Sequence, residues 1–288
     1  MEKLIEKAGV LIEALPYIRR FAGKSVVVKF GGNAMADDSI IEGVVTDVVL
    51  MKYVGMNPVL VHGGGPAISA ELRRRGVEPK FVEGLRVTDE ETMRVVEAIL
   101  VGQINTGIVR KVNVAGGRGV GVSGADGGLV KARRAHPVSR ETGEAVDIGF
   151  VGEVTSIDHT LLRVLEGNGF IPVVAPLGAD EAGCVYNVNA DEVAGRIAAS
   201  LKAEKLVILS NVPGVMRGKE VLSHLTVDAA GEMLESGEVT EGMIPKLRAG
   251  IAAVQGGAAK CHIVDGRIPH SMLLEIFTDA GVGTEIVA

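Results

Sequence analysis

The strongest constraint on the fold comes from two short apolar runs that each end in glycines and lead into a helical segment. Residues 25–30 (SVVVKF) run into Gly31 and Gly32, and residues 58–61 (PVLV) run into His62 and three further glycines. Short runs rich in Val are typical of strands buried on both faces of a parallel sheet. Because the carboxyl ends of parallel strands share one edge, we expect both glycine loops to lie together where open α/β sheets bind ligands.

The alternation of strand and helix continues along the chain. Further strands are predicted at residues 171–175, 205–210 and 260–264. Helices are predicted at residues 3–20, 39–53, 66–75, from a capping box at 88–91 to about 111, 158–167, 190–201, 228–236 and 244–255. We interpret residues 116–157, with β-like segments at 128–133 and 149–157, as a hairpin-bearing excursion from the core. The pattern predicts an α/β protein, a three-layer sandwich with a central, mostly parallel sheet and two lobes.

We expect three parts in the chain. They are an N-terminal helix at residues 1–21, a first lobe at 22–180 and a second lobe at 181–288.

Composition excludes several classes of protein. Of the 288 residues, 47% are hydrophobic and 3% aromatic, so Val, Ile, Leu and Ala must build the core. A net charge of -6 without a basic run argues against nucleic-acid binding. Neither an apolar stretch long enough for a membrane span nor the apolar run of a signal peptide is apparent. Cys184 and Cys261 form no CxxC pair, which favours reduced thiols. We therefore expect a cytoplasmic protein that binds neither membranes nor nucleic acid.

Two other glycine strings resemble phosphate loops only superficially. Gly119, Gly121 and Gly124 match a dinucleotide fingerprint, but the residues that follow are strand-like, so the required helix is missing. Gly218 and Lys219 suggest a P-loop, but Glu220 stands where Ser or Thr is needed.

The loops after residues 30 and 61 are better candidates for anion binding. Glycine lets backbone N–H groups approach an anion closely. Pro66 suits the first turn of a helix whose dipole favours negative charge. Lys29 would be costly within a buried Val-rich strand unless it emerges at a charged site.

Six motifs in order along the chain resemble those of the amino acid kinase family. They are KFGGNAM (29–35), VHGGGP (61–66), EGLRVTD (83–89), YNVNADEVAG (186–195), LSNVPGV (209–215) and EGMIPKL (241–247). The resemblance covers nearly the whole chain. It implies the amino acid kinase fold, with the amino-acid substrate in the first lobe and ATP in the second. It also implies transfer of the ATP γ-phosphate to the side-chain carboxylate of N-acetyl-L-glutamate, an early step of arginine biosynthesis.

The resemblance further implies roles for individual residues. Lys29 and Lys246 would contact the transferring phosphoryl group from the two lobes, positioned by Asp191. The residues implied at the substrate are Gly64, Gly65, Arg86, Asn187 and Asn189. The residues implied at the nucleotide are Gly31, Gly32, Ser210, Asn211, Gly214, Val215 and Met243. Mg²⁺ should accompany the ATP, and no protein ligands for a metal are expected.

Electrostatics agrees with these roles. A carboxylate that attacks a phosphate brings two anions together, so the main tasks are charge compensation and alignment. No general base is needed, because a carboxylate is already ionised near neutral pH. Arg86 offers a planar fork that matches a carboxylate. Asn189 and Asp191 could alternatively serve only as helix caps. Asn211 stands where some family members have an acidic residue, which would weaken a local charge near the nucleotide.

The ends of the chain resemble the arginine-inhibited members of the family. In those proteins an extra N-terminal helix interlaces dimers into a hexameric ring, a trimer of dimers, with arginine bound beside it. By position, Tyr17, His262, Glu275 and Gly281 would contribute to such a site.

Alternatives remain open at this point. Within the family they are a carbamate kinase or another amino acid kinase, although the chain carries no extra module of the kind usual in aspartokinases. A uridylate kinase would lack the context of Arg86. A sensor without catalysis is the alternative from another class, and the presence of Lys29, Asp191 and Lys246 argues against it.

Overall fold

The computed structural model describes residues 1–32, 35, 37–139, 142–240, 242–278 and 281–288. Motif residues 33–34 and 241 lie outside the described residues.

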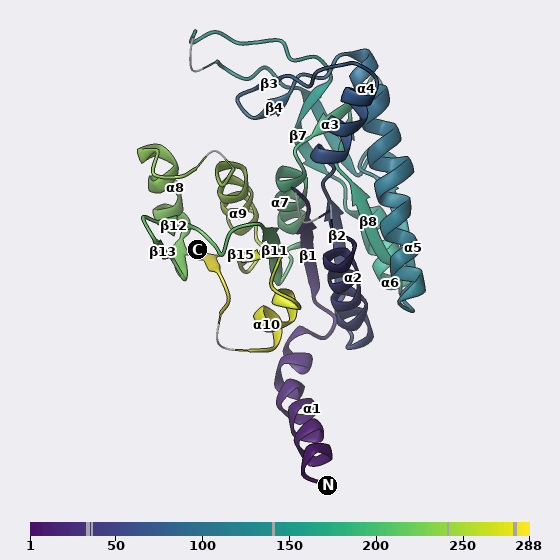
Figure 1. Cartoon of the computed structure of the whole chain (residues 1–288), viewed down its shortest axis with the longest axis vertical. Coiled ribbons are helices and arrows are strands. Elements are labelled where there is room, and N and C mark those ends of the chain that lie inside the picture. The colour runs from purple at the N-terminus through teal and green to yellow at the C-terminus, as the bar shows by residue number, and fades with distance from the viewer. Residues whose placement is uncertain (33–34, 36, 140–141, 241, 279–280) are drawn as a thin grey trace.

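An eight-stranded sheet forms the centre of the molecule (Figure 1). In spatial order its strands are β14 (His224–Thr226), β16 (Thr284–Val287), β15 (Cys261–Asp265), β11 (Lys205–Ser210), β1 (Ser25–Phe30), β2 (Asn57–His62), β8 (Ile171–Ala175) and β5 (Gly119–Ser123). Neighbouring strands are parallel except β15 and β16. The prediction of a mostly parallel sheet is confirmed. The sheet runs without a break through the β1–β11 pair, which joins the two predicted lobes; the boundary near residue 180 stays a prediction.

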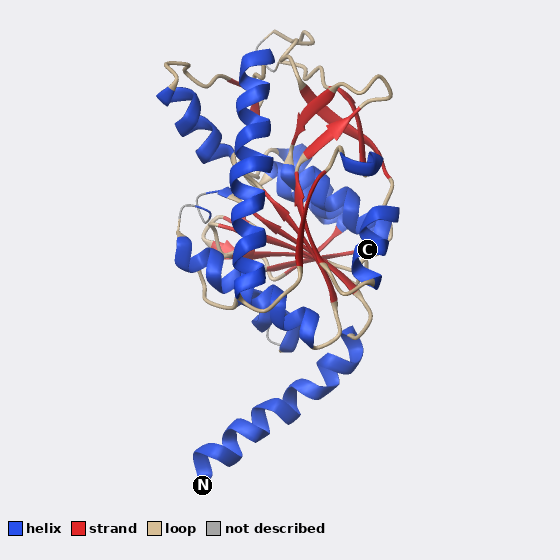
Figure 2. Cartoon of the chain, turned by 90° about the vertical axis from the view of Figure 1, so that its right-hand side faces the viewer, coloured by secondary structure: helices blue, strands red, loops and turns tan. Residues whose placement is uncertain are grey.

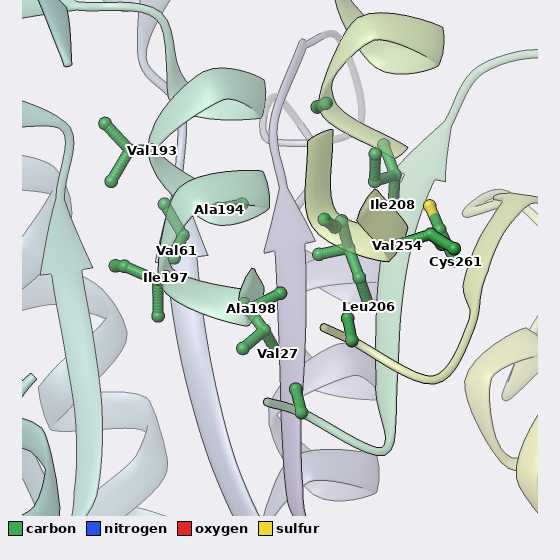
Figure 3. Close-up of a cluster of buried hydrophobic side chains, with 14 of the residues drawn as sticks. Val27, Val61, Val193, Ala194, Ile197, Ala198, Leu206, Ile208, Val254 and Cys261 are labelled. Carbon is green, nitrogen blue, oxygen red and sulfur yellow. The ribbon is translucent and has the colours of Figure 1, made fainter. Parts of the chain in front are cut away.

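Helices cover both faces of this sheet. The described helices are α1 (Glu2–Phe21), α2 (Asp38–Tyr53), α3 (Gly65–Arg74), α4 (Glu90–Glu97), the π-helix η2 (Ala98–Asn105), α5 (Thr106–Val114), the short η3 (Asp126–Gly128), α6 (Thr160–Gly167), α7 (Ala190–Leu201), α8 (Val227–Ser236), α9 (Ile244–Gln255) and α10 (Ser271–Phe277). Side chains alternate across β1, so Val27 packs toward α7 and α9 whereas Val26 and Val28 pack toward α2, α5 and α10. Figure 3 shows the first of these layers, with Ile197 and Ala198 of α7 against the strands. The three-layer arrangement thus follows from strands that are apolar on both faces.

The prediction that residues 116–157 leave the core was correct only for the later part of this segment. Gly119–Ser123 forms β5, the edge strand of the main sheet, because it pairs in parallel with β8. The later part does leave the sheet. It supplies β6 (Val130–Arg134) and β7 (Val151–Ile157), which pair in antiparallel fashion and close a small barrel with β9 (Leu177–Ala179) and β10 (Val185–Val188).

Two short hairpins complete the described strands. They are β3 (Phe81–Val82) with β4 (Leu85–Arg86), and β12 (Met216–Arg217) with β13 (Glu220–Val221). The β3–β4 hairpin and the small barrel lie at the end of the molecule opposite α1 (Figure 1).

The predicted capping box at residues 88–91 was wrong by one residue. Asp89 is the N-cap, and its side chain accepts the Thr92 N–H. Thr88 precedes the cap, where its N–H donates to the Ile148 carbonyl and its hydroxyl donates to the Arg86 carbonyl. The helix also continues past the expected end, through η2 and α5 to Val114.

Helix α1 projects from the body of the molecule (Figure 2). Among the side chains of α1 whose burial is described, only the last, Phe21, is buried, whereas Leu4, Leu11 and Ile12 are 64%, 73% and 69% exposed. Among the described residues, no helix combines the length and the apolar character needed to cross a membrane.

Candidate active site

The two glycine loops meet at the carboxyl edge of the sheet, as predicted. Phe30 lies opposite His62 in the β1–β2 register, so the residues that follow leave the sheet side by side. A Cβ on Gly31 would lie 3.2 Å from the Gly63 Cα, and Gly32 has a φ of 73°. The close approach at Gly31 and the left-handed backbone at Gly32 explain why these positions are glycines.

Asp191 contacts both lysines. The Lys29 Nζ lies 2.9 Å from one carboxylate oxygen of Asp191, and the Lys246 Nζ lies 3.6 Å from the other. All three side chains are largely buried. Lys29 comes from the end of β1, Asp191 from the first turn of α7 and Lys246 from the first turn of α9. We call these three residues the carboxyl-edge cluster.

A glycine allows α7 and α9 to bring this cluster together. A Cβ on Gly195 would lie 2.6 Å from the Ala249 carbonyl oxygen, so the two helices could not approach as closely with a larger residue. A glycine inside an otherwise helical segment was the signal for this close crossing, and sequence reasoning missed it.

The charges in the carboxyl-edge cluster are unbalanced. Burial favours the neutral form of Asp191, but Lys29 and Lys246 outweigh it and hold the pKa of Asp191 below its usual value. Burial lowers the pKa of Lys246, and the Asp191 charge offsets only part of this effect. One carboxylate therefore serves two buried ammonium groups, and the remaining positive charge can compensate an anion.

A cavity of about 260 Å³ opens beside this cluster. It lies just below the roughly 300–1,000 Å³ that is common for small-ligand sites. Its lining includes eight predicted site residues, namely Lys29, Gly32, Gly64, Gly65, Arg86, Asn187, Asn189 and Asp191. Apolar side chains complete it, among them Ile68, Leu85, Leu100 and Val151. The cavity thus combines positive charge with an apolar wall.

Arg86 is held at one nitrogen and unsatisfied at the other. Its Nη2 donates to the Gly65 carbonyl and to the Ser69 hydroxyl, at 3.0 and 2.8 Å. Among the described residues its buried Nη1 has no hydrogen-bond partner. Burial, with a smaller contribution from Arg73, lowers the pKa of Arg86. An anion in the cavity would relieve both the missing hydrogen bond and the uncompensated charge.

The two asparagines differ in their local roles. Asn189 is the N-cap of α7, and its side-chain oxygen accepts the N–H groups of Asp191 and Glu192. The Asn187 amide lies 3.4 Å from the Thr88 hydroxyl. Asn189 therefore acts as a helix cap, as the alternative interpretation predicted, whereas the Asp191 side chain contacts the two lysines.

Apart from Gly32, the predicted nucleotide residues lie at the same edge but outside the cavity lining. Ser210 ends β11 and is buried, Asn211 is exposed in the turn that follows, and Met243 precedes α9. The Val215 N–H donates to the Thr284 hydroxyl, and a Cβ on Gly214 would lie 2.6 Å from the same oxygen. Of the two glycines predicted at the nucleotide, Gly32 lines the cavity and Gly31 does not.

The described residues contain no group of three or more His, Cys, Asp or Glu side chains placed to hold a metal ion. Asp191 is the acidic residue of the cavity lining, and two lysines already neutralise it.

A second cavity, of about 300 Å³, lies at the amino edge of the same strands. All four residues predicted at an arginine site line it, namely Tyr17, His262, Glu275 and Gly281. Sequence reasoning missed other charged residues in the lining, which are Arg20, Glu204, Lys205, Lys260 and Glu285.

Glu275 is the centre of the charges in this second cavity. Its Oε1 lies 3.1 Å from the Lys205 Nζ and 2.8 Å from the His262 Nε2. The Nδ1 of His262 is buried and has no hydrogen-bond partner in the described part of the chain. We call Lys205, His262 and Glu275 the amino-edge cluster.

The fold and the carboxyl-edge cluster define a class of protein. Residues 24–265 match the model of the amino acid kinase family. The chain belongs to this family.

The particular relatives are acetylglutamate kinases. The chain is 53% identical to the one from Geotalea uraniireducens, over 100% of both chains. It is 54% identical to the one from Syntrophobacter fumaroxidans, over 99% of this chain and 97% of the relative. The predictions of an amino acid kinase fold and of an enzyme similar to acetylglutamate kinases are confirmed.

Solved structures agree with the fold. The N-acetylglutamate synthase from Neisseria gonorrhoeae, complexed with coenzyme A and N-acetyl-glutamate, superposes with a TM-score of 0.85 at 26% identity. The match covers 98% of this chain and 63% of the synthase. The same synthase has also been solved with coenzyme A and L-arginine, and this structure gives a TM-score of 0.81. The carbamate kinase from Giardia lamblia bound to AMP-PNP shares the fold, with a TM-score of 0.67 at 19% identity.

Proposed function

We propose that this kinase phosphorylates the side-chain carboxylate of N-acetyl-L-glutamate with ATP, producing N-acetylglutamyl 5-phosphate and ADP for arginine biosynthesis in the cytoplasm. The observation that carries the proposal is the carboxyl-edge cluster beside a cavity that contains an unsatisfied arginine. The full-length similarity to acetylglutamate kinases supports the choice of substrate.

In the proposed reaction, a carboxylate oxygen of the substrate attacks the γ-phosphorus of ATP. A bond forms between that oxygen and phosphorus, while the bond from phosphorus to the β–γ bridging oxygen breaks and ADP leaves. Lys29 and Lys246 compensate the negative charge on the transferring group, and Asp191 fixes the distance between them. The substrate carboxylate needs no base because it is ionised at neutral pH.

The substrate is oriented by contacts away from the reacting carboxylate. The Arg86 Nη1 donates to the α-carboxylate, which supplies its missing partner. Asn187 hydrogen-bonds the acetylated amino group, and the apolar wall at Leu85 and Val151 excludes water. A free amino acid would place an ammonium group against this cationic site, which explains the proposed preference for the acetylated form.

ATP-dependent kinases require a divalent cation, and we propose Mg²⁺ here. Asp191, the acidic residue of the cavity lining, is already paired with two lysines, so we propose that phosphate oxygens of the nucleotide and water would hold the ion. When bound, it would neutralise phosphate charge that the two lysines do not reach.

Trapping of the acyl phosphate with hydroxylamine tests the proposed reaction. We expect ATP-dependent hydroxamate with N-acetylglutamate and none with glutamate, aspartate or carbamate. Turnover with one of the other acceptors would show another member of the family, and no turnover with any of them would favour a sensor.

We further propose that arginine inhibits the enzyme from the second cavity. That cavity is lined by acidic, cationic and hydroxyl groups, which suit an amino acid with a charged side chain. Isothermal titration with arginine, and with citrulline as the uncharged control, tests this. Binding of arginine with inhibition supports the proposal, and equal responses to both ligands contradict it.

We propose that α1 assembles the chain into a hexamer, a trimer of dimers. Exposed apolar side chains on α1, including Leu11 and Ile12, support an interface between copies. Light scattering of the full chain, of Leu11→Glu and of a chain without residues 1–20 tests this. The full chain should be hexameric and both variants smaller, with loss of arginine sensitivity on deletion; hexamers in all three would contradict the role of α1.

A further inference from the structure

The loop that follows β2 is held by a chain of hydrogen bonds that the proposed reaction does not yet use. His62 is completely buried and Asn105 is 4% exposed. The His62 Nδ1 lies 2.9 Å from the Gly63 carbonyl oxygen, and its Nε2 lies 3.1 Å from the Asn105 Nδ2. The Asn105 Nδ2 also lies 2.8 Å from the Val173 carbonyl oxygen.

These contacts determine which ring nitrogen carries the proton. The Val173 carbonyl can only accept, so the Asn105 atom beside it must be the amide nitrogen. The same NH₂ group then donates its second hydrogen to the His62 Nε2, which must be unprotonated. Burial lowers the pKa of His62 to about 4, so the ring is neutral at physiological pH. Its single proton therefore lies on Nδ1 and is donated to the Gly63 carbonyl.

Holding this carbonyl orients the next N–H. In a trans peptide the C=O and N–H groups point in opposite directions. The Gly63 carbonyl is turned toward the buried imidazole, so the Gly64 N–H is turned away from the imidazole, and both glycines line the cavity. On its other side Gly63 is fixed as well, because its N–H donates to the Phe30 carbonyl at 2.8 Å.

A π-helix brings the required side chains to this loop. A Cβ on Gly64 would lie 2.5 Å from Leu100 and 2.8 Å from Ile104, both of which belong to η2 together with Asn105. In a π-helix the hydrogen bonds join residues five apart. Leu100 and Asn105 are five apart, and they contact the same loop, Leu100 at Gly64 and Asn105 at His62. Gly121 of β5 leaves room for the Asn105 side chain. The π-helix η2 and Gly121 on β5 thus both allow Asn105 to contact His62.

We propose that Asn105 is a positioning residue that acts through His62 to hold the Gly63–Gly64 peptide, so that the Gly64 N–H points at the phosphoryl group being transferred. The inference rests on the proposed phosphoryl transfer for its target, and on the hydrogen bonds alone for the orientation. The fixed tautomer of His62 donates only from Nδ1, to the Gly63 carbonyl. The Gly64 N–H then stabilises charge in the transition state without any rearrangement during the reaction.

Two replacements of His62 separate this role from simple packing. In His62→Asn the side-chain amide nitrogen can occupy the place of Nδ1, one bond beyond Cγ, and still donate to the Gly63 carbonyl. In His62→Gln the amide lies at the place of Nε2 and that donor is lost. We expect kcat of the Gln variant to fall about 10²-fold and kcat of the Asn variant at least about tenfold less, with KM for both substrates within about threefold of wild type. Equal kcat in the two variants, or a change mainly in KM, would overturn the proposal.

A spectroscopic measurement tests the tautomer without any assay of activity. The imidazole ¹⁵N spectrum of the ¹⁵N-histidine-labelled full chain should show His62 as the neutral Nδ1–H form, assigned by its loss in His62→Asn. Asn105→Ala should shift it toward a mixture of tautomers and lower kcat about tenfold. An Nε2–H form in the wild type, or an unchanged spectrum and kcat in Asn105→Ala, would overturn the proposal. If the wild type fails to phosphorylate N-acetylglutamate, the proposed function fails, while the spectrum still decides the orientation.

Discussion

The two edges of the central sheet carry clusters that resemble each other but differ in charge balance. At the carboxyl edge, Asp191 contacts two lysines, and the nearby cavity adds Arg86. At the amino edge, Glu275 contacts one lysine and His262, whose pKa burial lowers, and further acidic residues line the cavity. The first cluster therefore has excess positive charge, and the second is close to balance.

This difference in charge balance predicts what each cavity can bind. Excess buried positive charge is unfavourable without an anion, so the carboxyl edge suits phosphate and carboxylate groups. A balanced set of donors and acceptors suits a zwitterion such as an amino acid. The same strands, β1, β11 and β15, pair in parallel and connect the two edges, so the groups proposed for catalysis and those proposed for regulation lie at opposite ends of these strands.

The largest expected effect is on turnover at the carboxyl edge. Lys29→Met and Lys246→Met each remove one ammonium group that compensates the negative charge of the transferring phosphoryl group. In each variant kcat should therefore fall about 10²–10³-fold. Steady-state kinetics with hydroxylamine trapping measures this, and Lys131→Met, an exposed lysine, is the control. Affinity for N-acetylglutamate should change far less, and a defect mainly in binding would mean that the role of the lysines is wrongly assigned.

The next effect concerns substrate binding in the same cavity. Arg86→Lys keeps the charge but loses the planar fork, so the substrate α-carboxylate loses a charge-assisted hydrogen bond worth about 1.5–3 kcal/mol. KM for N-acetylglutamate should rise about tenfold or more. Arg73→Lys, at an exposed arginine close by, is the matched control. An unchanged KM in Arg86→Lys would exclude this residue from the substrate site.

A smaller effect on turnover, and a large one on regulation, is expected at the amino edge. Glu275→Gln keeps the shape of the side chain but removes the charge that faces Lys205 and His262. Half-inhibition by arginine should require at least about tenfold more arginine, because a charged partner is lost. Turnover without arginine should fall much less than in the lysine variants. The exposed Glu232→Gln is the control, and retained arginine sensitivity would separate the cavity from inhibition.

Sequence reasoning found the carboxyl edge because local patterns mark it. Apolar strands that end in glycines predict where Gly31 and Gly64 lie, and the cost of burying Lys29 in a Val-rich strand predicts a charged site. The same reasoning applies to Lys205, the first residue of the apolar run KLVILS, and would have indicated the amino edge.

Other features depend on contacts that no local pattern records. Asn105 contacts His62, 43 positions away, from the end of the π-helix η2. Strands β14 and β16 are three and four residues long and derive their stability from the sheet they join, so their short runs carried no clear periodicity. The small barrel brings β10 beside β7 and β9, a pairing set by tertiary packing.

The smallest expected effect concerns stability, and it tests whether both edges depend on a neutral histidine. Burial lowers the pKa of His62 to about 4 and also lowers that of His262. In the unfolded chain these histidines have a pKa near 6.5, so this contribution to stability is complete above that pH and is lost as the pH falls toward the folded pKa. For His62 this amounts to about 2 kcal/mol between pH ~7.5 and pH ~5. Urea unfolding at both pH values should show this loss in the wild type and a smaller one in His62→Asn, with the exposed His136→Asn as the control. If His62→Asn loses as much stability as the wild type, the imidazole at the carboxyl edge is not kept neutral by the fold, and only the amino edge would retain a histidine of that kind.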